Sequence, residues 1–143
     1  MTKGGVLLAG MGVALLLAPA AAFADPCKAI PDRGPAPAHL SPGSKFRGPV
    51  TYVGDGDSLC VGQGARPDQW VEVRLADFYA PELSAPGGRE AKEALERIVR
   101  GKTLTCVAGR RSFDRVVADC RLGSASVGDL MRRAGVAEGG NGR

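Results

Sequence analysis

The sequence predicts a small domain that is mainly β with two helices, arranged as a five-stranded antiparallel barrel of the oligonucleotide-binding type (OB-fold). Three observations lead to this prediction, and the first two are short apolar runs separated by turn residues and two segments with apolar side chains at helical spacing. A third is their order, which is strand, strand, strand, helix, strand, strand, helix. A two-layer α+β sandwich is the alternative that this pattern leaves open.

The first three strands are predicted from two short apolar runs and one alternating segment. Residues 46–53 and 58–61 are joined by the triplet Asp-Gly-Asp, and an Asp-Gly pair between two such runs is a strong hairpin signal. Residues 70–78, WVEVRLADF, alternate apolar and polar side chains. We expect one face of this strand to be buried and the other to carry Arg74.

Two helices and a second hairpin follow. The segment GREAKEALERIVRG, residues 88–101, has apolar residues at helical spacing and a final glycine that should end the helix. A shorter helix should begin at Ser126 with a sequence that resembles a capping box, and it should end at Gly135. Between the helices, residues 103–122 read as two strands that are symmetric about Phe113.

We expect four segments along the chain. Residues 1–24 have a lysine, an apolar stretch and a small-residue cleavage pattern, which favour a removed signal peptide over a membrane anchor. Residues 25–45 are rich in proline and should form an extended arm without a core of its own. The compact domain should cover residues 46–137, and residues 138–143 should be a flexible, glycine-rich tail.

All four cysteines follow the predicted signal peptide, and an even number in this context implies disulfide bonds and an oxidising compartment. If the second hairpin is symmetric, Cys106 lies opposite Cys120, so we expect these two to bond and Cys27 to bond Cys60. The other two pairings remain open. Zinc is disfavoured because the chain has no CxxC pair and its one histidine, His39, lies among prolines.

The net charge of +4 falls to +3 when Lys3 is removed with the signal peptide. Most of the basic residues are arginines, which favour bidentate contacts with phosphate or carboxylate groups. A charge of this size does not separate an anion-binding surface from an ordinary solvated one.

Five motifs, taken together and in order, resemble the thermonuclease family, the staphylococcal-nuclease-like (SNase-like) calcium-dependent nucleases. They are Asp-Gly-Asp followed by Ser58, R-L-x-x-x-x-x-P-E from Arg74 to Glu82, G-x-E-A from Gly88 to Ala91, Arg115, and the closing VGDLMRRAGVA at 127–137. The resemblance runs from about Phe46 to Ala137 and implies the same five-stranded barrel.

The resemblance also implies roles for five residues. Asp57 would bind calcium, and Glu82 would be the general base that activates the attacking water. Arg74 and Arg115 would grip the phosphate, whose anionic charge must be neutralised before a nucleophile can attack. Phe113 would pack against the nucleotide, and because stacking tolerates any base, we expect low sequence specificity.

Two features depart from the family pattern. The family's second metal-ligand carboxylate lies where this chain has Tyr79, and a neutral phenol is a poor ligand for calcium. Asp77, on the same face of the predicted strand, is left open as a replacement. We therefore expect weak Ca²⁺ binding or the use of another divalent ion. The family also continues into a C-terminal helix with nucleotide-contacting tyrosines, whereas this sequence stops at Arg143.

The resemblance thus implies a secreted or periplasmic nuclease that hydrolyses DNA and RNA and prefers single strands. We expect a monomer with no stable membrane association after cleavage. One alternative is a catalytically weakened barrel that only binds single-stranded nucleic acid, which Tyr79 favours. Another is a structural or interaction module. The presence of Glu82 together with Asp57 and the two arginines favours the nuclease, because a binding module needs no general base.

Overall fold

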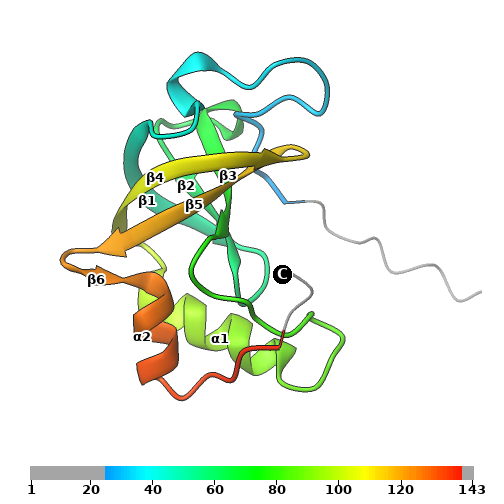
Figure 1. Ribbon diagram of the computed structural model, residues 1–143, viewed down its shortest axis with the longest axis vertical. Helices are drawn as coiled ribbons and strands as arrows, with labels where there is room; N and C mark the ends of the chain where they lie inside the picture. Colours follow the sequence, from blue (N-terminus) through cyan, green and yellow to red (C-terminus); the bar gives the residue numbers. More distant parts are fainter. Residues whose placement is uncertain (1–24, 140–143) are drawn as a thin grey trace, which may run out of the picture.

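The computed structural model describes residues 25–139. Five strands close into a barrel, and two α-helices pack at one end of it (Figure 1), which confirms the predicted OB-type fold. The strands are β1 (Lys45–Val53), β2 (Ser58–Gly62), β3 (Trp70–Leu75), β4 (Thr103–Ser112), β5 (Arg115–Leu122) and the short β6 (Ala125–Ser126). The helices are η1 (Ala38–Leu40), η2 (Pro67–Gln69), α1 (Gly88–Val99) and α2 (Val127–Arg133). The predicted signal peptide and residues 140–143 of the predicted tail lie outside the described residues.

The barrel closes through one parallel pairing. The strand order is β3-β2-β1-β4-β5 with antiparallel neighbours, and β3 then pairs with β5 in parallel, so that Val73 lies opposite Val116 and Leu75 opposite Ala118. The interior is filled by apolar side chains from strands β1 to β5, among them Phe46, Val61, Val71, Val73, Leu75, Leu104 and Val116. Closure removes the exposed edges that β3 and β5 would otherwise have.

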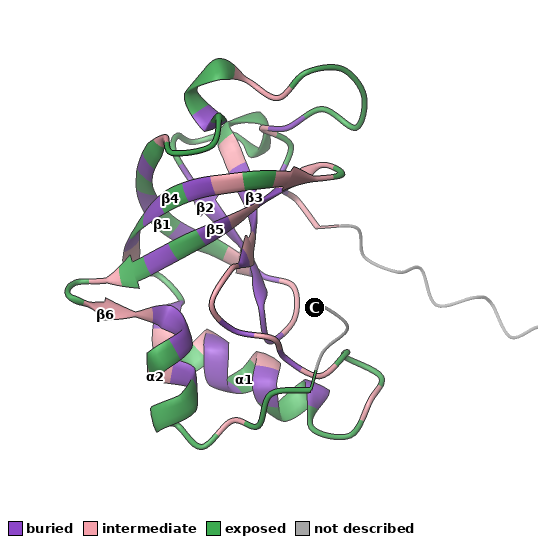
Figure 2. Ribbon diagram, viewed as in Figure 1, coloured by how far each residue is buried: buried purple, intermediate pink, exposed green. Residues whose placement is uncertain are grey.

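Strand β3 differs from its prediction in two ways. It ends at Leu75, and the following residues turn away toward α1 because Phe78 inserts into the core, where it is fully buried. Most of β3 is buried (Figure 2), including its inner face, as the alternation predicts. On the outer face, however, Glu72 is only 9% exposed. At Glu72, the outer face of β3 is therefore covered by other parts of the chain.

The proline-rich arm provides part of this cover. Its backbone runs beside the start of β3, where the Ala29 N–H donates to the Trp70 carbonyl at 3.0 Å. The arm has no separate core, but Ile30 and Leu40 are buried in the core of the barrel. Arg111 on β4 donates to carbonyl oxygens of the arm at positions 31 and 34 and so fixes the second hairpin against it. No helix in the described part of the chain is both long and apolar enough to cross a membrane.

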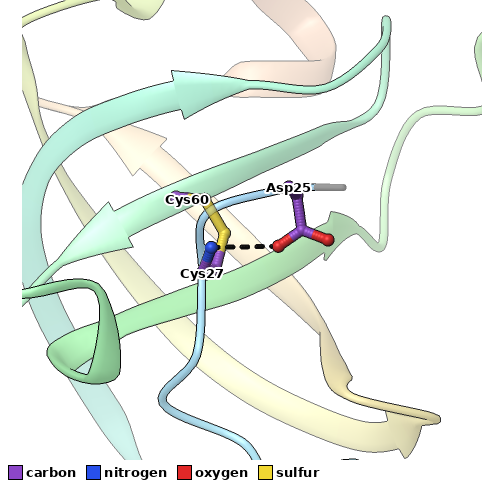
Figure 3. Close-up of side chains that lie close together, drawn as sticks. All are labelled: Asp25, Cys27 and Cys60. Carbon is purple, nitrogen blue, oxygen red and sulfur yellow. Dashed lines mark hydrogen bonds between the residues drawn. A yellow bond between two sulfur atoms is a disulfide. The ribbon is translucent and has the colours of Figure 1, made fainter. Parts of the chain in front are cut away.

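Both expected disulfide bonds are present. Cys106 lies opposite Cys120 in the β4–β5 ladder, with a Cα–Cα distance of 4.1 Å, which confirms the symmetric register at that level. Closer to the tip of this hairpin an irregularity shifts the register by one residue. Cys27 bonds Cys60 with a Cα–Cα distance of 5.7 Å, and this bond fastens the arm to β2 (Figure 3).

Candidate active site

The Asp-Gly-Asp turn is held in place by its own backbone and by Asp55. The Gly54 N–H donates to the Ser58 carbonyl at 2.9 Å and closes the β1–β2 hairpin. The Asp57 N–H donates to Asp55 Oδ1 at 3.0 Å, and the Leu75 N–H donates to the Asp57 carbonyl at 2.8 Å. Asp57 therefore leaves the turn at a fixed position beside the end of β3.

Gly56 lets two other segments approach this turn. A Cβ atom at Gly56 would lie 2.5 Å from the Ala80 Cβ and 2.6 Å from the Ala91 Cβ. These distances are below van der Waals contact, so a side chain does not fit without movement of its neighbours. Since Ala80 belongs to the loop after β3 and Ala91 to α1, the glycine allows turn, loop and helix to meet.

Asp57 and Arg74 come together because of the β2–β3 register. Ser58 lies opposite Arg74, which brings the preceding Asp57 to the same end of the ladder. Asp57 Oδ2 lies 3.9 Å from Arg74 Nη2 and accepts the Ala80 N–H at 3.0 Å. Asp57 is 6% exposed. One carboxylate thus joins the turn, β3 and the loop that leads to Glu82.

The surroundings of Asp57 favour an additional positive charge. Burial first and then the neighbouring Asp55 raise the pKa of Asp57, while the Ala80 N–H and Arg74 lower it, and the net pKa is about 7. Two carboxylates in a partly dehydrated site are short of positive charge, and a divalent ion bound there would supply it. Both offer hard oxygen ligands, so the residues present fit calcium or a similar ion.

Neither Tyr79 nor Asp77 supplies a carboxylate beside Asp57. The Tyr79 N–H donates to Glu138 Oε1 at 3.2 Å, and the Tyr79 carbonyl accepts the Gly139 N–H at 3.0 Å. Glu138 and Gly139, the first two residues of the predicted tail, are therefore hydrogen-bonded to the loop that follows β3. The Asp77 carboxylate lies against α2, with Oδ2 2.5 Å from the place that a Gly128 Cβ would take. The second carboxylate beside Asp57 is Asp55.

Glu82 lies on the loop between β3 and α1, with its residue exposed. Its side chain makes no hydrogen bond or ion pair with the residues that the structure describes. Its backbone, however, is tightly placed: the carbonyl accepts the Ala85 N–H at 2.8 Å, and a Cβ at Gly88 would lie only 2.0 Å from that carbonyl oxygen. The first residue of α1 therefore fixes where the Glu82 backbone lies, while the carboxylate remains open to solvent.

Arg115 reaches the same strand as Arg74 through the parallel β3–β5 pairing. The register that places Val73 opposite Val116 brings Arg115 beside Glu72, and Arg115 Nη1 lies 4.0 Å from Glu72 Oε1. Glu72 and Arg74 are two residues apart on β3, so both lie on its outer face, about 7 Å from each other along the strand. The two arginines consequently share one face of the barrel, each next to a carboxylate.

Phe113 forms the tip of the β4–β5 hairpin. It is 84% exposed, the largest exposure among the large apolar side chains of the described residues, and its φ of 57° is in the left-handed region that bulky residues rarely adopt. Arg111 donates to the Phe113 carbonyl and helps to hold the turn. The ring is thus exposed to solvent two residues before Arg115, and its packing against a nucleotide stays a prediction.

Sequence reasoning missed the acidic residues that surround the two arginines. Asp55 lies in the same triplet as Asp57, and Glu72 lies two residues before Arg74 on the same face of the strand. The sequence could therefore have indicated that both acidic residues lie near the site. Asp25 and Asp114 could not be connected with Glu72 before the position of the arm was known. They are the acidic neighbours that, after burial, raise the pKa of Glu72 to about 7.

Because of this shift, Glu72 should make stability depend on pH. In the folded protein, Arg115 and Lys28 lower the pKa of Glu72 while Asp25 and Asp114 raise it, and the net value of about 7 exceeds the unfolded value of 4.5. The folded state then holds the additional proton, so this contribution is present below pH 4.5 and is lost as the pH rises through 7.

Glu72→Gln in a metal chelator should therefore raise the free energy of unfolding at pH 8 by about 1–2 kcal/mol, because a pKa unit corresponds to about 1.4 kcal/mol and solvent screening reduces the total. At pH 4.5 the variant should match the wild type. Urea unfolding followed by circular dichroism measures both values. A variant that is equally or less stable at pH 8 contradicts the predicted sign. Asp57 titrates in the same range, so part of the pH dependence should persist in the variant.

Comparison with known proteins gives a partial match. Over 66 residues, 46% of this chain, the sequence is 38% identical to a protein from Oryza sativa subsp. japonica described as "Probable staphylococcal-like nuclease CAN1". The chain spans about a fifth of that protein, since the matched region covers 20% of it. No family model matches the chain. The chain is therefore similar to the staphylococcal-nuclease-like proteins. The partial sequence match and the closed five-stranded barrel with two helices both support this similarity.

Proposed function

We propose that this protein is a metal-dependent nuclease that hydrolyses phosphodiester bonds of DNA and RNA with low sequence specificity, single strands being preferred. The observation that carries the proposal is the meeting of Asp57 and Arg74, 3.9 Å apart, at the start of the loop that leads to Glu82. The two disulfide bonds support a secreted or periplasmic location, because such bonds persist in oxidising compartments.

The residues divide the chemistry between charge neutralisation and proton transfer. Arg74 and Arg115 bind the non-bridging oxygens of the phosphate, and each leaves its present carboxylate partner to do so. Glu82 accepts a proton from the attacking water, and its exposed carboxylate is accessible to that water. Phe113 stacks on a base, which explains why sequence preference should be low.

Asp57 and Asp55 are the residues that would hold the metal. A bound divalent ion supplies positive charge to the phosphoryl oxygens, where charge develops as the nucleophile attacks. The backbone contacts that fix Asp57 mean that this ligand needs little reorganisation to bind an ion. We propose calcium, bound weakly because the second carboxylate comes from Asp55 and the Tyr79 position offers only a phenol.

A barrel that binds nucleic acid without cutting it is the second candidate. Tyr79 favours this second candidate, because its side chain is a phenol where a metal-binding carboxylate is expected. Its backbone is hydrogen-bonded to Glu138 and Gly139. In such a protein the arginines and Phe113 would bind single strands, and Glu82 would have no role.

Incubation of the oxidised protein with denatured DNA and RNA tests the proposal. We expect shortened products in the presence of Ca²⁺ or another divalent ion and none in excess chelator. Binding without cleavage in every divalent ion tested would instead support the second candidate.

Tyr79→Asp should raise calcium affinity about tenfold and increase cleavage at limiting calcium, because a carboxylate is a better ligand for this ion than a phenol. Calcium titration of the cleavage rate gives the apparent affinity. Tyr79→Phe is the matched control, since it removes the hydroxyl without adding a carboxylate, and it should not lower the calcium requirement. An unchanged calcium dependence in Tyr79→Asp contradicts the placement of residue 79 beside the metal.

A further inference from the structure

We propose that Asp25, Glu72 and Asp114 form a second site for a divalent cation, on the outer face of the barrel and separate from Asp57. One carboxylate oxygen from each residue lies within 4.8 Å of the other two. Calcium–oxygen distances are about 2.3–2.6 Å, so two ligands on opposite sides of the ion are about 4.6–5.2 Å apart. The three oxygens can therefore contact one calcium ion with little change in their positions.

The strongest support for this second site is the buried carboxylate of Glu72 in the cluster. Glu72 is 9% exposed, and its Oε2 atom is buried without a hydrogen-bond partner. Its other oxygen, Oε1, is 4.0 Å from Arg115 Nη1, at the limit of an ion pair. Buried carboxylate oxygens are usually hydrogen-bonded or bound to a metal, because an unsatisfied one loses its hydration without compensation. A cation bound by Glu72 through Oε2 would satisfy this atom.

The three ligands come from segments far apart in the sequence, and each is held near the others. Asp25 lies in the arm, where its Oδ1 accepts the Cys27 N–H at 3.0 Å (Figure 3), and Cys27 is bonded to Cys60, which lies opposite Glu72 in the β2–β3 ladder. Asp114 lies in the hairpin turn next to Arg115. Asp25 and Asp114 are partly exposed, which gives an ion a route from solvent.

The charges of the cluster also favour a cation. Lys28 and Arg115 are the positive groups that act on Glu72, against the three carboxylates Asp25, Glu72 and Asp114. The nearby sulfur atoms of Cys27 and Cys60 are bonded to each other and are not available as ligands. A bound ion would join the arm, β3 and the hairpin tip, and it would reduce the attraction that draws Arg115 toward Glu72.

Calcium titration of variants separates this site from the one at Asp57. Isothermal titration calorimetry at pH 8 gives the number of ions bound, and thermal unfolding with calcium or chelator gives the change in Tm. The wild type should bind two ions. Asp114→Asn and Asp25→Asn should each lower the affinity of one site about tenfold or more and reduce the calcium-dependent rise in Tm. Asp119→Asn, an exposed acidic residue on β5 outside the cluster, is the control and should behave like the wild type.

The outcomes distinguish the two sites. Asp57→Asn should lose the other ion and keep the one bound by Asp25, Glu72 and Asp114, even if the nuclease proposal fails. If Asp114→Asn and Asp25→Asn keep the wild-type stoichiometry and calcium-dependent Tm, the second site is overturned. It is also overturned if both variants are more stable than the wild type by the same amount in calcium and in chelator, because the cluster then reflects repulsion alone.

Discussion

Replacement of Glu82 with Gln should lower the turnover of nucleic-acid cleavage by about 10²–10⁴-fold, the usual contribution of a general base. Gln keeps the shape of the side chain but cannot accept the proton of the attacking water. The Glu82 side chain is exposed and makes no hydrogen bond within the described residues, so stability should be unchanged. Single-turnover cleavage and equilibrium binding to a labelled single strand measure the two effects separately, and binding should change by less than about threefold.

Glu90→Gln is the matched control for this experiment. It lies in the first turn of α1, is exposed, and undergoes the same change of charge and shape. We expect wild-type turnover from it. If Glu82→Gln loses affinity and turnover by the same factor, Glu82 acts in binding and not as the base.

Gly88→Ala should reduce both stability and turnover, although Gly→Ala within a helix normally stabilises a protein. The added Cβ would lie 2.0 Å from the Glu82 carbonyl oxygen and 2.9 Å from the Leu83 Cα, so the backbone of the loop must move. Overpacking of this kind costs about 1–3 kcal/mol of unfolding free energy. A displaced Glu82 should lower turnover about tenfold to a hundredfold, because small shifts of a catalytic group have large effects.

Gly101→Ala, just beyond the other end of α1, is the control. Its φ of 71° makes alanine unfavourable, but nothing lies within 4 Å of the added Cβ. It should therefore lose about 1 kcal/mol of stability and retain full turnover. A Gly88→Ala protein that is more stable than the wild type and fully active would show that α1 does not position the Glu82 loop.

The barrel could be predicted from sequence because its strands follow simple periodic patterns. The alternation of Val71, Val73 and Leu75 and the symmetry of the β4–β5 hairpin gave the buried faces and the Cys106–Cys120 pair. The alternation breaks after Leu75, where Asp77 is polar and Phe78 is one residue out of phase, but this break does not reveal that Phe78 is buried in the core where the backbone leaves the sheet. The burial of Glu72 also depends on contacts with the arm, about 45 residues away in the sequence, which no local pattern contains.

The candidate site could be predicted in part. Motif spacing identified the turn with Asp57 and the strand with Arg74, which the structure brings to 3.9 Å from each other. Spacing could not reveal which acidic residue lies next to Asp57, because the Asp57 N–H bonds Asp55 within the turn and Asp77 packs on α2. Motif spacing also could not predict the roles of Gly56 and Gly88, which let α1 approach the Asp-Gly-Asp turn and the Glu82 loop. The catalytic roles of Glu82, Arg115 and Phe113 stay predictions.

Single-turnover digestion of denatured DNA by the oxidised wild-type protein and by Asp57→Asn tests the central claim most directly. With saturating calcium we predict rapid cleavage by the wild type, a loss of about 10²-fold or more in Asp57→Asn, and no cleavage by either protein in chelator. The folded state of each protein is checked by its circular dichroism spectrum, and binding by a labelled single strand. Equal cleavage by the two proteins in calcium, or cleavage by the wild type that persists in chelator, would contradict a metal-dependent reaction centred on Asp57.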